Sequence, residues 1–113
     1  MSELNNQGVF GSAARSEVLM AIYLLDQTYP RELARLLGKS LTPVQKSIEG
    51  LERAGLVATW PDGAARRVTL NPRYVALKEL RALLQALTIH EFELQDKLAQ
   101  QRRRPRRIGK EIA

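Results

Sequence analysis

Apolar residues recur at helical spacing in the first part of the chain, between residues that favour the ends of helices. Residues 12–26 form the first expected helix, because Ser12 is a favourable N-cap and the apolar residues after it share one face. That face consists of Val18, Leu19, Ile22 and Leu25. Residues 27–29 form a short link that is expected to pair as a minimal strand. Residues 30–37 form the second helix, since a proline suits its first turn and Gly38 favours its end.

In the next segment, apolar residues first recur at helical spacing and then alternate with polar residues as in strands. Residues 41–54 form the third expected helix, which follows Ser40 and ends before a glycine. Its apolar face consists of Val44, Ile48 and Leu51, and its polar face of Thr42, Gln45, Lys46, Glu49 and Arg53. Two strands, 56–60 and 66–70, flank the turn 61–64, whose Asp-Gly pair is typical of a hairpin.

Residues 72–103 carry a leucine pattern typical of helices that pack against other helices. Pro72 is expected to be the first residue of a helix, after an asparagine cap. The seam consists of Leu77, Leu80, Leu84, Leu87, Leu94 and Leu98. A capping box at 88–91, with Leu87 and Phe92 as a hydrophobic staple, favours a break near Thr88. One long helix is the alternative, because the last two leucines keep the register of the seam.

Composition excludes several kinds of functional site. The chain has no cysteine, and its single histidine is His90, so neither a thiolate centre nor a cluster of histidine ligands is expected. Paired carboxylates, an activated nucleophile and a phosphate-binding loop do not stand out, so we expect no enzymatic activity and no cofactor. The sequence has no apolar run long enough for a bilayer, and residues 1–11 lack a signal-peptide pattern. We therefore expect a cytoplasmic protein without membrane contact.

The positive charge is concentrated at the C-terminal end of the chain. The formal net charge is +6 at pH 7. Six of the eighteen basic residues, but only one of the twelve acidic residues, lie in 102–113. The rest of the chain is therefore close to neutral, and the arrangement of its charges has to carry any argument for nucleic acid. Residues 104–113 are expected to form a basic, disordered tail, because they hold too few apolar residues to bury.

Residues 37–57 resemble the helix-turn-helix core of the ArsR/MarR-type winged-helix regulators. In that core a Leu-Gly-x-Ser turn, here 37–40, leads into the recognition helix, and Leu-x-x-Ala-Gly-Leu-Val, here 51–57, leads out of it. The stretch 10–72 also resembles winged-helix regulators that are often encoded beside small nucleotidyltransferases. The resemblance covers roughly 10–87 and implies a mainly α fold with a small β-hairpin wing.

The expected organisation has four parts. They are a flexible N-terminal arm (1–11), a winged helix-turn-helix domain that binds DNA (12–71), a C-terminal helical region for dimerisation (72–103) and the basic tail (104–113). The leucine seam has two interpretations, because it can close the chain's own core or pair with its copy in a two-fold dimer. The resemblance implies the dimer, which also matches a pseudo-palindromic DNA site.

A recognition helix has to turn apolar residues to the core and polar donors to the major groove. The expected DNA-contact residues are Arg31, Lys39, Ser40, Thr42, Gln45, Lys46, Ser47, Arg66 and Arg67. Glutamine can contact adenine with two hydrogen bonds, and lysine can reach guanine or a phosphate. The two arginines beside the wing turn are expected to reach the minor groove or a phosphate, while Arg31 and Lys39 bracket the backbone.

Three residues of the third helix depart from the usual pattern. Leu41 occupies a position where related helices carry a polar base-contacting residue, and its angular position predicts packing instead. Glu49 places an acid on the expected DNA face. Gly50 lies within the helix, where glycine costs up to about 1 kcal/mol relative to alanine, which indicates close packing against another helix.

The sequence favours one function and leaves others open. The main hypothesis is a sequence-specific regulator of transcription, a homodimeric repressor that places residues 41–49 in the major groove of double-stranded DNA. The alternative is a protein-interaction module that acts with a partner enzyme or the transcription machinery, which the near-neutral globule and Glu49 favour. A third hypothesis, RNA binding through the arginine tail, lacks the exposed aromatic platform expected for single strands.

Overall fold

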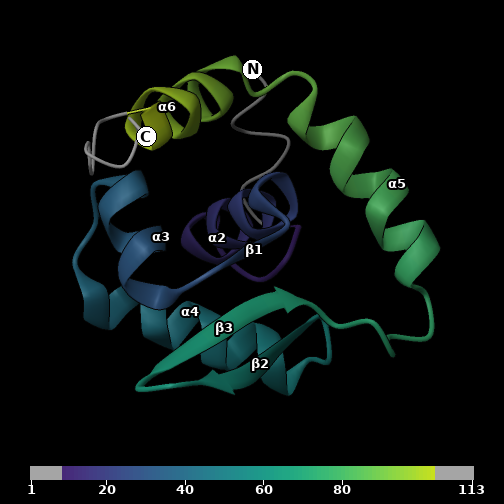
Figure 1. The fold of residues 1–113 in the computed structure, drawn as a ribbon. Helices are drawn as coiled ribbons and strands as arrows, with labels where there is room; N and C mark the ends of the chain where they lie inside the picture. Colours follow the sequence, from purple (N-terminus) through teal and green to yellow (C-terminus); the bar gives the residue numbers. More distant parts are fainter. Residues whose placement is uncertain (1–8, 104–113) are drawn as a thin grey trace, which may run out of the picture.

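The structure is a computed structural model that describes residues 9–103, with side chains described as far as Gln100. The predicted basic tail and the first eight residues of the predicted arm lie outside the described residues. The elements, shown in Figure 1, are α2 (Ala13–Leu25), β1 (Gln27–Thr28), α3 (Pro30–Leu37), α4 (Leu41–Arg53), β2 (Val57–Asp62), β3 (Ala65–Leu70), α5 (Leu77–Thr88) and α6 (Phe92–Arg103).

Helix α2 lies at the centre of the molecule, with the other helices and the sheet around it (Figure 1). Its buried face includes Val18, Leu19 and Ile22, as predicted, whereas Leu25 at the end of the helix is half-buried. Ser12 caps the helix, because its Oγ accepts a hydrogen bond of 3.0 Å from the backbone N–H of Arg15. Phe10, near the end of the predicted arm, packs against the core.

Helices α3 and α4 form the predicted helix-turn-helix pair. The bounds of α3 match the prediction, and Gly38 ends it in the left-handed conformation at φ 67°. Helix α4 buries Val44, Ile48 and Leu51 at 4% exposure or less, as predicted. Leu41 packs partly against the core, also as predicted. The two helices pack against each other and against α2.

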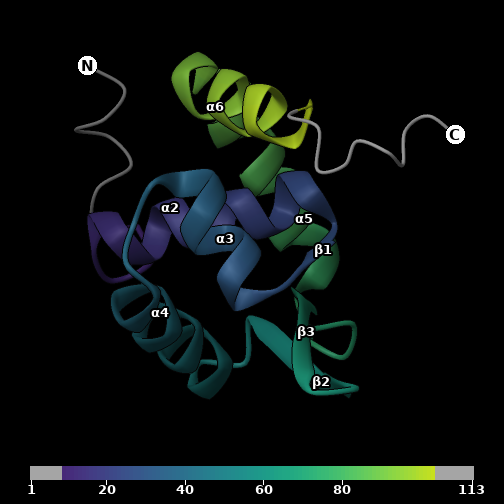
Figure 2. The same ribbon diagram turned by 60° about the vertical axis from the view of Figure 1, so that its left-hand side comes forward.

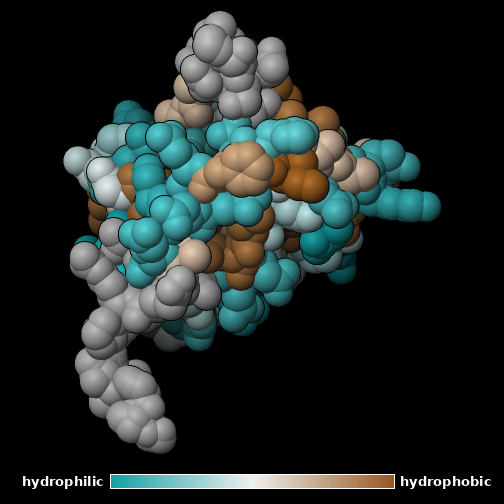
Figure 3. All heavy atoms as spheres, turned by 90° about the horizontal axis from the view of Figure 1, so that it is seen from above, coloured by the Kyte–Doolittle hydropathy of each residue, from teal (hydrophilic) through white to brown (hydrophobic). Residues whose placement is uncertain are grey.

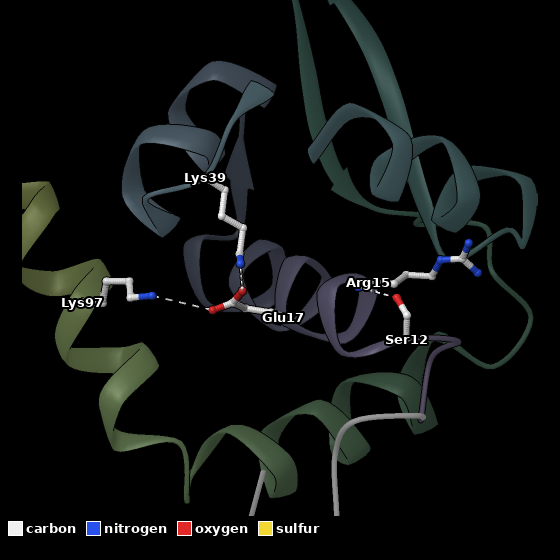
Figure 4. A network of polar contacts seen from close by, with 5 residues as sticks. All are labelled: Ser12, Arg15, Glu17, Lys39 and Lys97. Atoms are coloured by element: carbon white, nitrogen blue, oxygen red, sulfur yellow. Dashed lines mark hydrogen bonds and ion pairs between the residues drawn. The ribbon is translucent and has the colours of Figure 1, made fainter. Parts of the chain in front are cut away.

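The buried glycine of α4 has a close neighbour on α2. A Cβ atom at Gly50 would lie 2.6 Å from Nη2 of Arg15, whose guanidinium therefore rests on the backbone of α4. Figure 4 shows the Arg15 side chain reaching from α2 toward α4. The close helix packing predicted from Gly50 is confirmed.

The sheet has the order β1-β3-β2, and all of its pairs are antiparallel. The predicted turn 61–64 is wrong, because Pro61 and Asp62 belong to β2 and only the residues at 63 and 64 connect the strands. A proline is tolerated there because β2 is an edge strand. Gly63 supplies the positive φ, 62°, that the shorter turn requires.

Helix α5 begins five residues later than predicted, at Leu77 rather than at Pro72. The reason is a set of hydrogen bonds made by Asn71. Its side chain donates to the carbonyl of Gly55 at 3.0 Å and accepts from the N–H of Arg73 at 2.9 Å. These bonds tie residues 71–76 to the end of α4 as a series of turns, so the asparagine is a tertiary anchor instead of a helix cap.

The predicted break between α5 and α6 is confirmed, but its predicted cause is wrong. Thr88 is the last residue of α5, and its hydroxyl donates to the carbonyl of Leu84 at 2.7 Å. It is therefore not the N-cap of a capping box. Phe92 is 71% exposed, so the predicted hydrophobic staple does not form. The carbonyl of Glu91 accepts from the N–H of Gln95 and begins α6.

Helix α6 packs against α2 and α3, on the opposite side of the molecule from α4 and the hairpin (Figure 2). Four of the seam leucines, at 6% exposure or less, already lie in the chain's own core: Leu80, Leu84, Leu94 and Leu98. Leu77 and Leu87 are half-buried against the same core. This burial agrees with the interpretation that the leucine seam closes the chain's own core. The dimer interface itself stays a prediction.

Candidate nucleic-acid interface

The exposed face of α4 carries the polar residues that the sequence places there. Thr42, Gln45 and Lys46 are exposed, whereas Ser47 is half-buried. Ser40 is the N-cap residue of α4, but in the described structure its side chain makes no capping hydrogen bond. Its hydroxyl therefore remains beside the N-terminus of the helix, where backbone N–H groups and the helix dipole favour an anion such as a phosphate.

A groove lies where the start of α3, the middle of α4 and the tip of the hairpin meet. It is lined by Tyr29, Arg31, Gln45, Asp62 and Arg66, among others, and has a volume of about 560 Å³. We call it the wing groove. Three predicted DNA-contact residues therefore come together from three different elements, although they are far apart along the chain.

The two wing arginines lie on opposite faces of the hairpin, since neighbouring residues of a strand alternate. Arg66 shares a face with Thr59 and donates to its hydroxyl. Thr59 in turn donates to Glu52 of α4 at 2.9 Å, so this face is the one turned toward α4. Arg67 pairs with Trp60 on the outer face. The sequence prediction treated the arginines as a pair, whereas the structure separates their directions.

Lys39 does not line the wing groove. Its Nζ lies 3.3 Å from Oε1 of Glu17 on α2, and Nζ of Lys97 on α6 lies 3.7 Å from the other oxygen of the same carboxylate. Figure 4 shows both lysines directed at Glu17, Lys39 from above and Lys97 from the left. A residue predicted to contact the DNA backbone is thus paired within the chain, and no local feature of the sequence indicates this partner.

A second pairing that sequence reasoning missed crosses the wing groove. The hydroxyl of Tyr29, just before α3, donates to Oδ2 of Asp62 at the tip of β2, with 2.6 Å between the two oxygens. This hydrogen bond, together with partial burial, raises the pKa of Tyr29 above its ordinary value of 10.0. The residues are 33 positions apart, and neither belongs to a motif that indicates the contact.

Neither metal binding nor membrane insertion is indicated by the described residues. In residues 9–103, no cluster of three or more histidine, aspartate or glutamate side chains is arranged to hold a metal ion. None of the helices described here has both the length and the hydrophobicity that crossing a membrane requires. The predicted contact residues that line the wing groove, Arg31, Gln45 and Arg66, are cations or hydrogen-bond donors.

Comparison with known proteins supports the fold. No protein-family model and no curated protein matches the chain. A similar solved structure is the crystal structure of the adhesin competence repressor (AdcR) from Streptococcus pyogenes, with 18% sequence identity and a TM-score of 0.56. The match covers 78% of this chain and 65% of that one, so the chain spans less than two thirds of the repressor. Together with the helix order and the three-stranded antiparallel sheet, this likeness shows that the chain has a winged-helix fold.

Proposed function

We propose that this protein is a homodimeric regulator of transcription, a repressor that binds double-stranded DNA in a sequence-specific way. The observation that carries the proposal is the convergence of Arg31, Gln45 and Arg66 on the wing groove, beside the polar face of α4. The fold supports it, because the similar solved structure is that of a repressor.

Helix α4 is the element that enters the major groove in this proposal. Thr42, Gln45 and Lys46 project from its N-terminal half, which is the part of a recognition helix that contacts base edges. Gln45 is suited to adenine, and Lys46 to guanine or a phosphate. Arg31 and Arg66 line the same groove as Gln45, and in this proposal they contact the flanking backbone.

The second copy in the proposed dimer covers apolar side chains of α5, of the turn after it and of the start of α6. Leu83, Ile89 and Phe92 are 42%, 54% and 71% exposed. Figure 3 views the molecule from the side of α6 and shows hydrophobic areas among the hydrophilic surface. Burial of these side chains against a copy, beyond the leucines already in the core, gives the dimer its apolar contact.

The binding experiment compares fluorescence anisotropy for the DNA upstream of the protein's own gene with that for a random duplex. The variant Gln45→Ala/Lys46→Ala removes two base-contacting side chains, and we expect it to lose at least about tenfold in affinity for the specific duplex. Its matched control is Gln85→Ala/Lys78→Ala, which removes the same residue types from exposed positions of α5. The control is expected to bind as the wild type does.

A chain that ends at Gln101 completes the experiment. We expect this shortened chain to retain the preference for the specific duplex and to show a weaker salt dependence. The reason is that the basic residues of the removed tail contact phosphates without sequence preference. Binding that ignores sequence, is unaffected by the α4 variant and vanishes with the tail would contradict the proposal. The protein-interaction module would then become the leading hypothesis.

Sedimentation measures the proposed dimer independently of DNA. We expect a dimer for the wild type and a monomer for Phe92→Glu, which places a charge in the proposed contact. Val75→Glu is the matched control, because Val75 is 96% exposed and lies outside the proposed contact, before α5. A wild type that remains monomeric at micromolar concentration contradicts the dimer but not the binding of DNA.

A further inference from the structure

The outer half of the hairpin extends away from the hydrophobic core. Every residue from Pro61 to Arg66 is exposed, whereas Val57, Val68 and Leu70 at the other end of the strands are buried. The position of the tip relative to α4 therefore depends on polar contacts. Two such contacts are present, the link from Arg66 through Thr59 to α4 and the hydrogen bond from Tyr29 to Asp62.

We propose that Tyr29 is a positioning residue that acts through Asp62 to hold the tip of the wing at a fixed distance from α4 and so prepares the wing groove for DNA. The proposal rests on the proposed function, and it assigns to Tyr29 and Asp62 a role that neither the sequence motifs nor the fold comparison assigns. Neither residue has to contact DNA for this role.

Tyr29 is suited to the role because its backbone is held on both sides. Thr28 before it is fully buried, pairs with Val68 of β3 and donates its hydroxyl to Glu32 of α3 at 2.6 Å. The carbonyl of Tyr29 accepts from the N–H of Leu33 at 2.9 Å, which makes Tyr29 the N-cap residue of α3. The phenol therefore projects from a fixed point of the helix-turn-helix toward the more exposed tip.

Asp62 is well placed for a hydrogen bond that restrains the tip of the hairpin. It pairs with Ala65 as the last pair before the turn, so a hydrogen bond to it restrains the whole tip. Asp62 also lines the wing groove, where its carboxylate would repel a phosphate. By donating to Oδ2 of Asp62, the phenol of Tyr29 offsets part of this negative charge.

The link also lowers the cost of binding. A tip without it samples more positions, and ordering it on DNA loses conformational entropy that the wild type has already lost on folding. We expect Tyr29→Phe, which keeps the ring and removes only the hydroxyl, to bind the specific duplex roughly three- to tenfold more weakly. The salt dependence of binding is expected to stay unchanged, because the substitution alters no formal charge.

The experiment is a double-mutant cycle of Tyr29→Phe and Asp62→Ala, with Tyr23→Phe on α2 as the matched control. DNA affinity is measured by anisotropy, and hydrogen exchange of residues 61–66 is measured in the free protein. Trp60, the chain's one tryptophan, reports the mobility of the wing by its fluorescence. We expect Tyr29→Phe to speed exchange at the tip, to weaken DNA binding, and to add no further loss in the Asp62→Ala background.

The outcomes separate this proposal from the proposed function. A wild type that binds the specific duplex while Tyr29→Phe binds it equally well overturns the role of Tyr29 alone. Losses that add independently in the double variant overturn it too, because the two residues would then act separately. A wild type that binds no duplex overturns the proposed function, and with it the role of Tyr29 in binding.

Discussion

The α4–hairpin side and the α5–α6 side of the molecule use different kinds of interaction. On the first side the distinctive contacts are polar and exposed, such as Tyr29 to Asp62 and Thr59 to Glu52. On the second side leucines from both helices complete the hydrophobic core, with Leu84 fully buried. We infer that the exposed polar side chains of the first side can be changed with little loss of stability, whereas the buried leucines of the second side contribute to the stability of the domain.

The largest expected effect tests the second side with two neighbouring leucines. Leu84→Ala removes a fully buried side chain of α5, and we expect the free energy of unfolding to fall by about 2–5 kcal/mol. Leu83→Ala removes the same atoms at a position that is 42% exposed, and its effect is expected to stay within about 1 kcal/mol. Urea denaturation of the two variants measures both values.

Protein concentration provides the control for this pair. Because Leu84 is buried within one chain, the stability loss of Leu84→Ala is expected to be the same at low and high protein concentration. The Leu83 variant is expected to weaken self-association instead. A stability loss that appears only in Leu83→Ala would contradict the intrachain role of the seam.

The next effect contrasts two serines that the sequence places at the starts of helices. Ser12 accepts a hydrogen bond from Arg15 and caps α2, so we expect Ser12→Ala to lower the free energy of unfolding by about 1 kcal/mol. Ser40 makes no capping bond in the described structure, so Ser40→Ala is expected to cost less stability and to weaken DNA binding instead. Thermal melts and anisotropy titrations on both variants test this exchange of roles, and equal stability losses would contradict it.

A third prediction concerns the pH at which the wing is released. The hydrogen bond to Asp62 favours the protonated phenol and raises the pKa of Tyr29 above 10.0. The stabilising contribution is therefore complete below the ordinary tyrosine pKa and is lost as the pH rises through the raised one. Tyrosinate absorbance is expected to show that Asp62→Ala moves one ionisation to lower pH, and Tyr29→Phe removes it. A wild-type titration identical to that of Asp62→Ala would show that the bond does not form in solution.

Local signals predicted the ends of several helices correctly because the physical cause was itself local. Ser12, the proline at the start of α3 and Gly38 act on neighbouring backbone groups, and all three are found where they were expected. The polar face of α4 follows from helical geometry alone. The element order and the main candidate surface could therefore be predicted before any contact was known.

In the failures, a side chain bonds to a partner other than the one that its local spacing suggests. Asn71 is a good helix cap by type, but its side chain bonds to Gly55 across the fold and delays α5. Thr88 has the spacing of a capping box but bonds back into the preceding helix. The two pairings that organise the site, made by Tyr29 and by Glu17, join segments far apart in the chain. Composition and periodicity contain no information about such partners.

The smallest expected effect tests whether the two sides communicate. Glu17 holds Lys39 beside the helix-turn-helix and Lys97 on α6 through one carboxylate, and all three side chains are partly exposed. Glu17→Gln frees Lys39 to contact a phosphate, so we expect DNA affinity to rise by up to about fivefold at low salt. The gain in DNA affinity is expected to disappear as salt screens the charges.

Lys97→Ala leaves the Glu17 carboxylate to Lys39 alone, so Lys39 is held more firmly away from DNA. This variant is expected to weaken DNA binding more than Lys78→Ala, which removes the same charge elsewhere. Anisotropy titrations measure the DNA affinity of these variants. Equal effects of the two lysine variants would mean that α6 does not influence the DNA-binding side through Glu17.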